Sequence, residues 1–141
     1  MRVFYVFNIK EEFHYLYQDS PLALYEMLRQ IYNLGSDDIL YGKNIFKQLT
    51  TSIDKEKIDR ELYIKLHQYM PYSKRGNTHF INNLYKEEIS RLVVKHSYMK
   101  IEVEASFSSF FDYISEFCGN YFACCFETMD FFFLDSAKTL V

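Results

Sequence analysis

The sequence predicts an α+β fold: one domain over residues 1–141, in which a five-stranded, mostly antiparallel sheet packs against a block of helices. The length of 141 residues is typical of one domain. The helical patterns form a continuous block between residues 11 and 70, and the strand patterns lie before and after it. Helices and strands therefore do not alternate as they do in a doubly wound sheet. No internal repeat interrupts the chain.

Residues 3–9 predict an inner strand because they are apolar on both faces. Successive side chains of an extended chain point to opposite faces. One face would carry Val3, Tyr5, Phe7 and Ile9, and the other would carry Phe4 and Val6. Such a strand is expected to be covered on both sides. Residues 11–17 follow with a helical pattern of about two turns.

Three further helices are predicted before residue 70. Ser20 and Pro21 are typical of an N-cap and a first helical position, and Gly35 is placed to end this helix. Ser36, which two aspartates follow, predicts the cap of a third helix. Asp54 is expected to open a fourth helix. The core stripe of this fourth helix would be Ile58, Leu62, Leu66 and Tyr69.

The region after the fourth helix contains the clearest strand pattern of the chain. Residues 71–88 are polar and irregular, and they predict only a turn around Gly76. Residues 92–94 and 99–104 predict two strands that pair through a turn at residues 96–97. The inward side chains of the second of these strands would be Met99, Ile101 and Val103.

The C-terminal part predicts a helix followed by a hairpin. Ser106 is the expected N-cap of a helix that carries several phenylalanines and ends near Gly119. Residues 121–126 and 131–134 are predicted to form the last two strands. Together with the strand at residues 3–9 and the pair after residue 91, they make up the five strands of the predicted sheet.

Composition and charge argue against several classes of function. The 16 basic and 19 acidic residues give a net charge of −3, whereas domains that bind nucleic acid carry a dense basic patch. No apolar run approaches the ~18 residues of a membrane span, and the N-terminus lacks the pattern of a signal peptide. The expected location is the cytoplasm, where the cysteines would stay reduced. Adjacent Cys124 and Cys125 would point to opposite faces of a strand.

The sequence contains no catalytic or metal-binding constellation. The 4 glycines do not cluster into a phosphate-binding loop, and no histidine lies at zinc-ligand spacing from another histidine or a cysteine. His67 on the fourth helix is expected to be structural. The acidic pairs at residues 11–12, 37–38 and 87–88 are interpreted as helix starts, where the helix dipole favours negative charge. We therefore expect no enzymatic activity, no metal and no cofactor.

Several segments, taken together, resemble one known family. They are the aromatic first strand that runs into Ile-Lys-Glu-Glu-Phe at residues 9–13, the tyrosine at position 17, the alternating strand at residues 99–105, and the tail at residues 122–126 and 133–135. Their order and spacing resemble the sporulation inhibitor of replication (SirA) family of endospore-forming Firmicutes. The resemblance extends over nearly the whole chain, although residues 35–90 align poorly.

This resemblance implies a small protein without enzymatic activity that blocks initiation of DNA replication during sporulation. It implies binding to the N-terminal domain of the initiator protein DnaA, with no direct contact to nucleic acid or membrane. The family's contact surface lies on the helix after the first strand, which corresponds here to Phe13 and Tyr17. A further contact on a later helix corresponds to Gln48. The chain would be a monomer that forms a one-to-one complex.

The residues of the short helix are compatible with such a surface. Phe13 and Tyr17 are four residues apart and share one helical face, while Leu16 is expected to face the core. Exposed aromatic rings are frequent hot spots of protein interfaces. For Phe13 two alternatives stay open, a core ring or a contact ring. The alternative functions are a nucleic-acid-binding module with aromatic rings on a sheet, and an enzyme with a site assembled from scattered residues.

Overall fold

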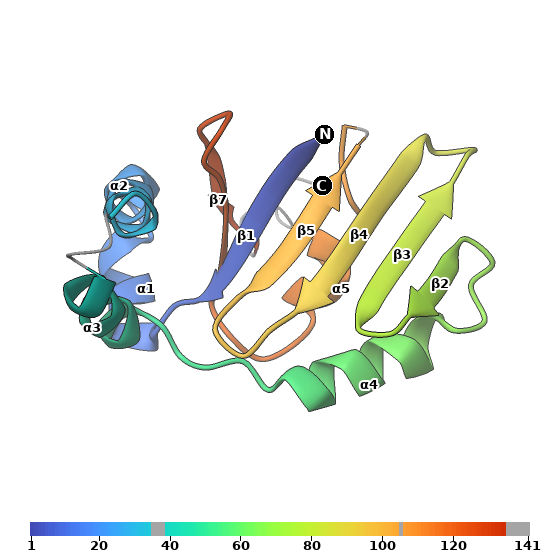
Figure 1. The fold of residues 1–141 in the computed structure, drawn as a ribbon, viewed down its shortest axis with the longest axis horizontal. Coiled ribbons are helices and arrows are strands. Elements are labelled where there is room, and N and C mark those ends of the chain that lie inside the picture. Colours follow the sequence, from blue (N-terminus) through green and yellow to red (C-terminus); the bar gives the residue numbers. More distant parts are fainter. Residues whose placement is uncertain (35–38, 105, 135–141) are drawn as a thin grey trace.

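The structure, a computed structural model of the chain, describes residues 1–34, 39–104 and 106–134 (Figure 1). The expected helix end at Gly35 and the expected cap at Ser36, with the two aspartates after it, lie outside these residues. Within the described residues the predicted α+β class is confirmed, but the sheet has seven strands rather than five. No helix in this part of the chain is both long and apolar enough to span a membrane.

Along the chain, a block of helices lies between the first strand and the other strands of the sheet. The elements in chain order are β1 (Arg2–Asn8), α1 (Glu11–Tyr17), α2 (Pro21–Tyr32), α3 (Ile39–Leu49), α4 (Lys55–Leu66), β2 (Tyr72–Arg75), β3 (Thr78–Asn83), β4 (Glu88–Val94), β5 (Met99–Val103), α5 (Phe110–Ser115), β6 (Tyr121–Cys125) and β7 (Asp130–Phe133). The strands are ordered β2-β3-β4-β5-β1-β6-β7, and every neighbouring pair is antiparallel. β1 is therefore an inner strand, as predicted.

The two strands that the sequence did not predict are β2 and β3, which form a hairpin within residues 71–88. The two strands pair in a register that sets Arg75 opposite Thr78, and Gly76 in the turn has a φ of +58°. The pattern lacks regular apolar alternation because one inward position of β3 is a histidine: His79 and Ile81 are both buried. The outward positions are polar or half-exposed. The expectation that this region is irregular is therefore wrong.

The sheet separates two hydrophobic cores. On the first face, α4 and α5 cover side chains from β2 to β6, including Phe4 and Val6 of β1. On the second face, α1, α2 and α3 cover only the side formed by β1, β6 and β7, including Phe7 of β1. Figure 1 shows these three helices grouped together beside β7, with α4 apart from them. Cys124 belongs to the second core and Cys125 to the first, which confirms that they point to opposite faces.

The starts of the helices agree with the sequence in two cases. Ser20 and Pro21 begin α2 as predicted. Asp54 is the N-cap of α4, and its carboxylate accepts a hydrogen bond of 3.3 Å from the backbone N–H of Lys57. The third expected start, at Ser106, is wrong, because α5 begins three residues later with Ser109 as its N-cap.

The start of α5 depends on an acid that the sequence analysis placed on a helix. Glu88 is the first residue of β4 and is fully buried. Its carboxylate accepts hydrogen bonds from the backbone N–H of Ser109 at 2.7 Å and from the Ser109 hydroxyl at 2.6 Å. A sheet residue thus holds the N-cap residue of α5 through two hydrogen bonds. The interpretation of residues 87–88 as a helix start is therefore wrong.

Candidate functional site

The short helix α1 is held in place by the end of α3. The backbone N–H of Lys10 donates a hydrogen bond of 2.9 Å to the carbonyl oxygen of Leu49, and that of Thr51 donates one of 2.7 Å to the carbonyl oxygen of Asn8. Between them, Ile9 and Thr50 form an antiparallel bridge. A helix of 7 residues is unstable alone in water. These main-chain bonds supply an attachment that the helix cannot supply itself.

One side of α1 packs on the second core. Phe13 and Tyr17 are half-buried, and both contact this core. His14 is also half-buried, and its ring meets the edge of Phe133 with 4.9 Å between the ring centroids. Phe13 and Tyr17 therefore lie on one face of the helix, as predicted, and each ring is shared between the core and the surface. The structure thus combines the two alternatives that the sequence left open for Phe13, with part of the ring in the core and part exposed.

The opposite side of α1 exposes apolar side chains. Tyr15 is 76% exposed and Leu16 is 63% exposed. The expectation that Leu16 faces the core is wrong. The reason is the helical period: once Phe13 and Tyr17 face inward, position 16 is about 100° away from position 17 and turns outward. Sequence reasoning expected Leu16 to be buried because of its apolar character, and it did not consider Tyr15 as a surface candidate.

Gln48 lies next in sequence to the residue of α3 that bonds to the start of α1. It is exposed in the last turn of α3 and directly precedes Leu49, whose carbonyl oxygen accepts the hydrogen bond from Lys10. Two of the three predicted contact residues, Phe13 and Tyr17, lie on α1, and the third lies on α3 next to the residue that bonds to the start of α1. We define the α1 surface as Phe13, Tyr15, Leu16, Tyr17 and Gln48.

A second group of functional side chains, which the sequence analysis missed, lies under α4. The Nε2 atom of His79 is 2.7 Å from Oδ1 of Asp59, and its Nδ1 atom is 2.8 Å from the hydroxyl of Tyr72. The Lys55 ammonium donates a hydrogen bond of 2.6 Å to the other carboxylate oxygen of Asp59. The signal in the sequence is the position of His79, two residues before buried Ile81 on the inward face of β3.

This network has perturbed acid–base properties but no access to a substrate. Burial lowers the pKa of His79, and the hydrogen bond to Asp59 opposes that effect only in part. Burial, with the nearby Asp59 carboxylate, raises the pKa of Tyr72 to about 12. A neutral His79 can donate from Nε2 to Asp59 and accept from Tyr72 at Nδ1, which satisfies all three groups. His79 is 0% exposed, so the arrangement is suited to holding α4 on the sheet.

The remaining groups that could carry chemistry are dispersed. In the ranges that the structure describes, no three side chains of histidine, cysteine, aspartate or glutamate are grouped as metal ligands. Cys118, Cys124 and Cys125 are free thiols, and only Cys118 is exposed. Burial raises the pKa of Cys124 well above its ordinary value, which makes it a poor nucleophile. His67 is exposed and bonds through Nδ1 to main-chain oxygens of its own helix.

The chain matches the model of a known protein family. A family model described as "Sporulation inhibitor of replication protein SirA" matches residues 2–138. This match covers nearly the whole chain and agrees with the resemblance that the sequence segments indicated. No curated protein sequence gives a significant match.

Proposed function

The chain belongs to the SirA family of sporulation inhibitors of replication, and we propose that it acts by binding the N-terminal domain of DnaA through the α1 surface. The observation that carries the proposal is the exposed apolar area of Tyr15 and Leu16 on a short helix that the protein holds firmly in place. Grouped apolar side chains that remain exposed are typical of interaction sites. The identity of the partner rests on the family resemblance.

The residues of the α1 surface would have different roles in such a complex. Phe13 and Tyr17 are anchored in the second core on one side, so little side-chain freedom remains to be lost when a partner covers their outer edges. Leu16 would add apolar contact area, and Gln48 would contribute hydrogen bonds at the rim. Aromatic anchors surrounded by smaller contacts are the usual arrangement of an interface hot spot.

The mechanism we propose is occupation of a surface, without a chemical step. The hydrogen-bonded network around His79, whose pKa values are perturbed, is centred on a fully buried histidine. A protein without catalytic activity can inhibit an initiator only while it is bound, so inhibition should follow the concentration of a one-to-one complex of the monomeric chain with the DnaA domain. The site of action would be the cytoplasm, where initiation takes place.

The experiment is a calorimetric titration of the purified chain into the isolated N-terminal domain of DnaA. The proposal predicts saturable binding with one chain per domain, and a complex of the corresponding mass in size-exclusion chromatography. A matched titration with a truncated DnaA that lacks this domain should give no heat of binding. Binding that is equal with and without the domain would contradict the proposal.

A second candidate function, nucleic-acid binding, is favoured by one observation on the sheet. No described helix covers the second face of β2–β5. On that face, the guanidinium carbons of Arg75 and Arg91 each lie 5.9 Å from the centroid of the Phe80 ring. However, Arg91 is also paired with Glu102 at 3.2 Å, which reduces its charge toward a phosphate. A steep loss of any DNA or RNA affinity with added salt would support this candidate.

A further inference from the structure

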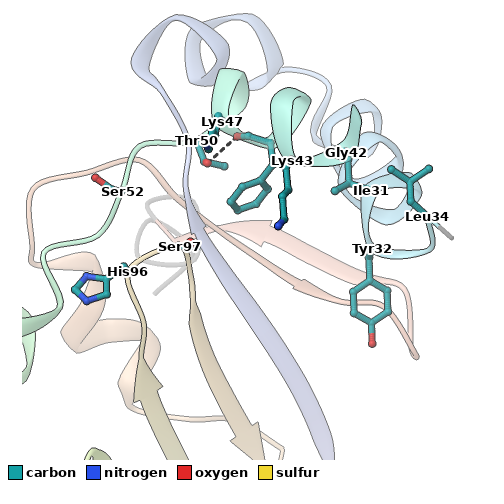
Figure 2. Close-up of a pocket in the computed structure, with 11 residues that line it drawn as sticks. Ile31, Tyr32, Leu34, Gly42, Lys43, Lys47, Thr50, Ser52, His96 and Ser97 are labelled. Carbon is teal, nitrogen blue, oxygen red and sulfur yellow. Dashed lines mark hydrogen bonds between the residues drawn. The ribbon is translucent and has the colours of Figure 1, made fainter. Parts of the chain in front are cut away.

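A groove separates the helical layer from the turn between β4 and β5. Its larger part has a volume of about 720 Å³, and a second cavity of about 320 Å³ adjoins it. The two parts share Ile31, Tyr32, Phe46 and Ser97. Figure 2 shows α2 and α3 on one side of the groove and the turn that carries His96 and Ser97 on the other. We call this feature the α3 groove.

The inner part of the α3 groove is apolar. It is lined by side chains of the second core and of the aromatic cluster beside it: Tyr5, Phe7, Leu28, Ile31, Tyr32, Phe46, Ser97 and Tyr98. Phe7 and Leu28 are buried, so they form a floor rather than a rim. Apart from Ser97 and the hydroxyl groups of the three tyrosines, this lining is made of aromatic rings and aliphatic chains. A ligand portion that enters here must therefore be hydrocarbon or aromatic.

The outer part of the α3 groove is basic. Lys43 and Lys47 line it from α3, and Figure 2 shows Lys43 extending from its helix into the groove. His96 stands on the opposite side and lies 3.8 Å from Glu56. No aspartate or glutamate is among the described residues that line either part, although the chain as a whole has more acidic than basic residues. The two ammonium groups at this end favour an anion.

We propose that the α3 groove binds a small amphipathic organic anion, with its apolar portion on Phe46 and Tyr98 and its anionic group near Lys43. The inference is independent of the proposed binding to DnaA, because it uses a different side of α3. The volume is in the range typical of small-molecule sites, which combine an apolar lining with a few polar groups that fix orientation. Because the inner part of the groove is apolar and the outer part is basic, the groove favours a ligand with one apolar end and one anionic end.

A peptide segment fits the α3 groove less well than a small molecule. Each peptide unit carries an N–H and a C=O group that need hydrogen-bond partners when they are buried. The inner part offers the hydroxyls of Ser97 and of three tyrosines, and otherwise rings and aliphatic chains, which are too few partners for the main-chain groups of a peptide segment. A chain that crossed this floor would leave polar groups unsatisfied, whereas an alkyl or aryl group would not.

The test uses anilinonaphthalene sulfonate, a fluorescent aromatic anion, with the full chain. We expect one saturable site per chain, and displacement of the dye by decanoate but not by an equal concentration of uncharged decanol. Reversal of the charge in Lys43→Glu should weaken dye binding about tenfold or more, because it replaces an attraction by a repulsion. Ser97→Trp should abolish binding, since position 97 lines both parts of the groove and a bulky ring there would fill it.

Matched controls separate the groove from other apolar surface. Lys86→Glu makes the same charge change at an exposed position that does not line the groove, and it should leave dye affinity unchanged. Melting curves should show all three variants folded. Equal dye affinity in the wild type and Lys43→Glu would overturn the proposal, as would dye-induced chemical-shift changes on α1 instead of near Phe46 and Tyr98. Displacement by a capped hexapeptide of alternating aspartate and leucine, but not by decanoate, would assign the groove to a protein partner instead.

Discussion

The backbone N–H of Lys10 donates a hydrogen bond of 2.9 Å to the carbonyl oxygen of Leu49, and this bond joins the start of α1 to the end of α3. Two segments far apart in the chain thereby form one surface. Gln48 directly precedes Leu49 in the last turn of α3. A partner can bind a helix that is already held in place at lower cost, whereas a freely moving helix of 7 residues would first have to be ordered.

The first prediction concerns the exposed side of α1. Leu16→Glu should leave the free energy of unfolding within about 0.5 kcal/mol of the wild type, because the side chain is largely exposed. It should weaken binding to the DnaA domain about tenfold or more, because a charge would be buried in an apolar contact. Urea unfolding and a binding titration measure the two effects. Loss of stability without loss of binding would assign Leu16 to the core after all.

The buried network around His79 predicts a pH dependence of stability. Burial lowers the folded-state pKa of His79 below the unfolded value of about 6.5. The unfolded state therefore takes up the proton first, and stability should be full above about pH 6.5 and fall as the pH decreases below it. The slope from one proton is at most about 1.4 kcal/mol per pH unit. In His79→Gln, unfolding free energies measured between about pH 7 and pH 5 should lose this contribution to the slope.

Substitutions in the turn between β2 and β3 should change the stability of the protein through backbone conformation alone. Gly76 has a φ of +58°, and a Cβ added there would meet no atom within 4 Å. Gly76→Ala should therefore destabilise the protein by about 1 kcal/mol through strain. Gly76→Asn should cost less, because asparagine tolerates this conformation. Equal unfolding midpoints for the alanine variant and the wild type would contradict the hairpin.

The cysteines predict a pattern of thiol reactivity. Cys118 is exposed, whereas Cys124 and Cys125 are buried in opposite cores. A thiol-specific aromatic disulfide reagent should modify Cys118 alone in the folded chain and all three thiols after unfolding. Cys118→Ser should then abolish the reaction of the folded protein. Rapid reaction of a second thiol under native conditions would show that one of the two cores opens readily.

Sequence patterns predicted the elements whose side chains follow one simple period. β1, β5 and the last hairpin are apolar at the expected positions, and α2 and α4 begin at the expected caps. The β2–β3 hairpin could not be predicted from apolar alternation, because buried His79 is polar and is satisfied only by Asp59 and Tyr72. Those partners are brought together by tertiary packing of α4 on the sheet.

The short helix that carries the candidate site was predictable, but the orientation of its side chains was not. The short helix and the shared face of Phe13 and Tyr17 followed from spacing alone. Which face turns inward depends on the contact with Phe133 and on the bond between Lys10 and Leu49, both of which join segments distant in sequence. For this reason Leu16 was expected inside and is found outside.

The most direct test of the central claim is the affinity of Tyr17→Ala for the isolated N-terminal domain of DnaA, measured by calorimetry beside wild type and His14→Ala. Loss of an aromatic anchor typically costs about 2 kcal/mol, so binding should weaken roughly thirtyfold. Both variants remove a half-buried ring from α1, so both should lower the melting temperature. His14→Ala, which removes the ring that packs on Phe133, should bind nearly as the wild type does. Equal affinities of the two folded variants would contradict the role of Tyr17 and place the interface elsewhere.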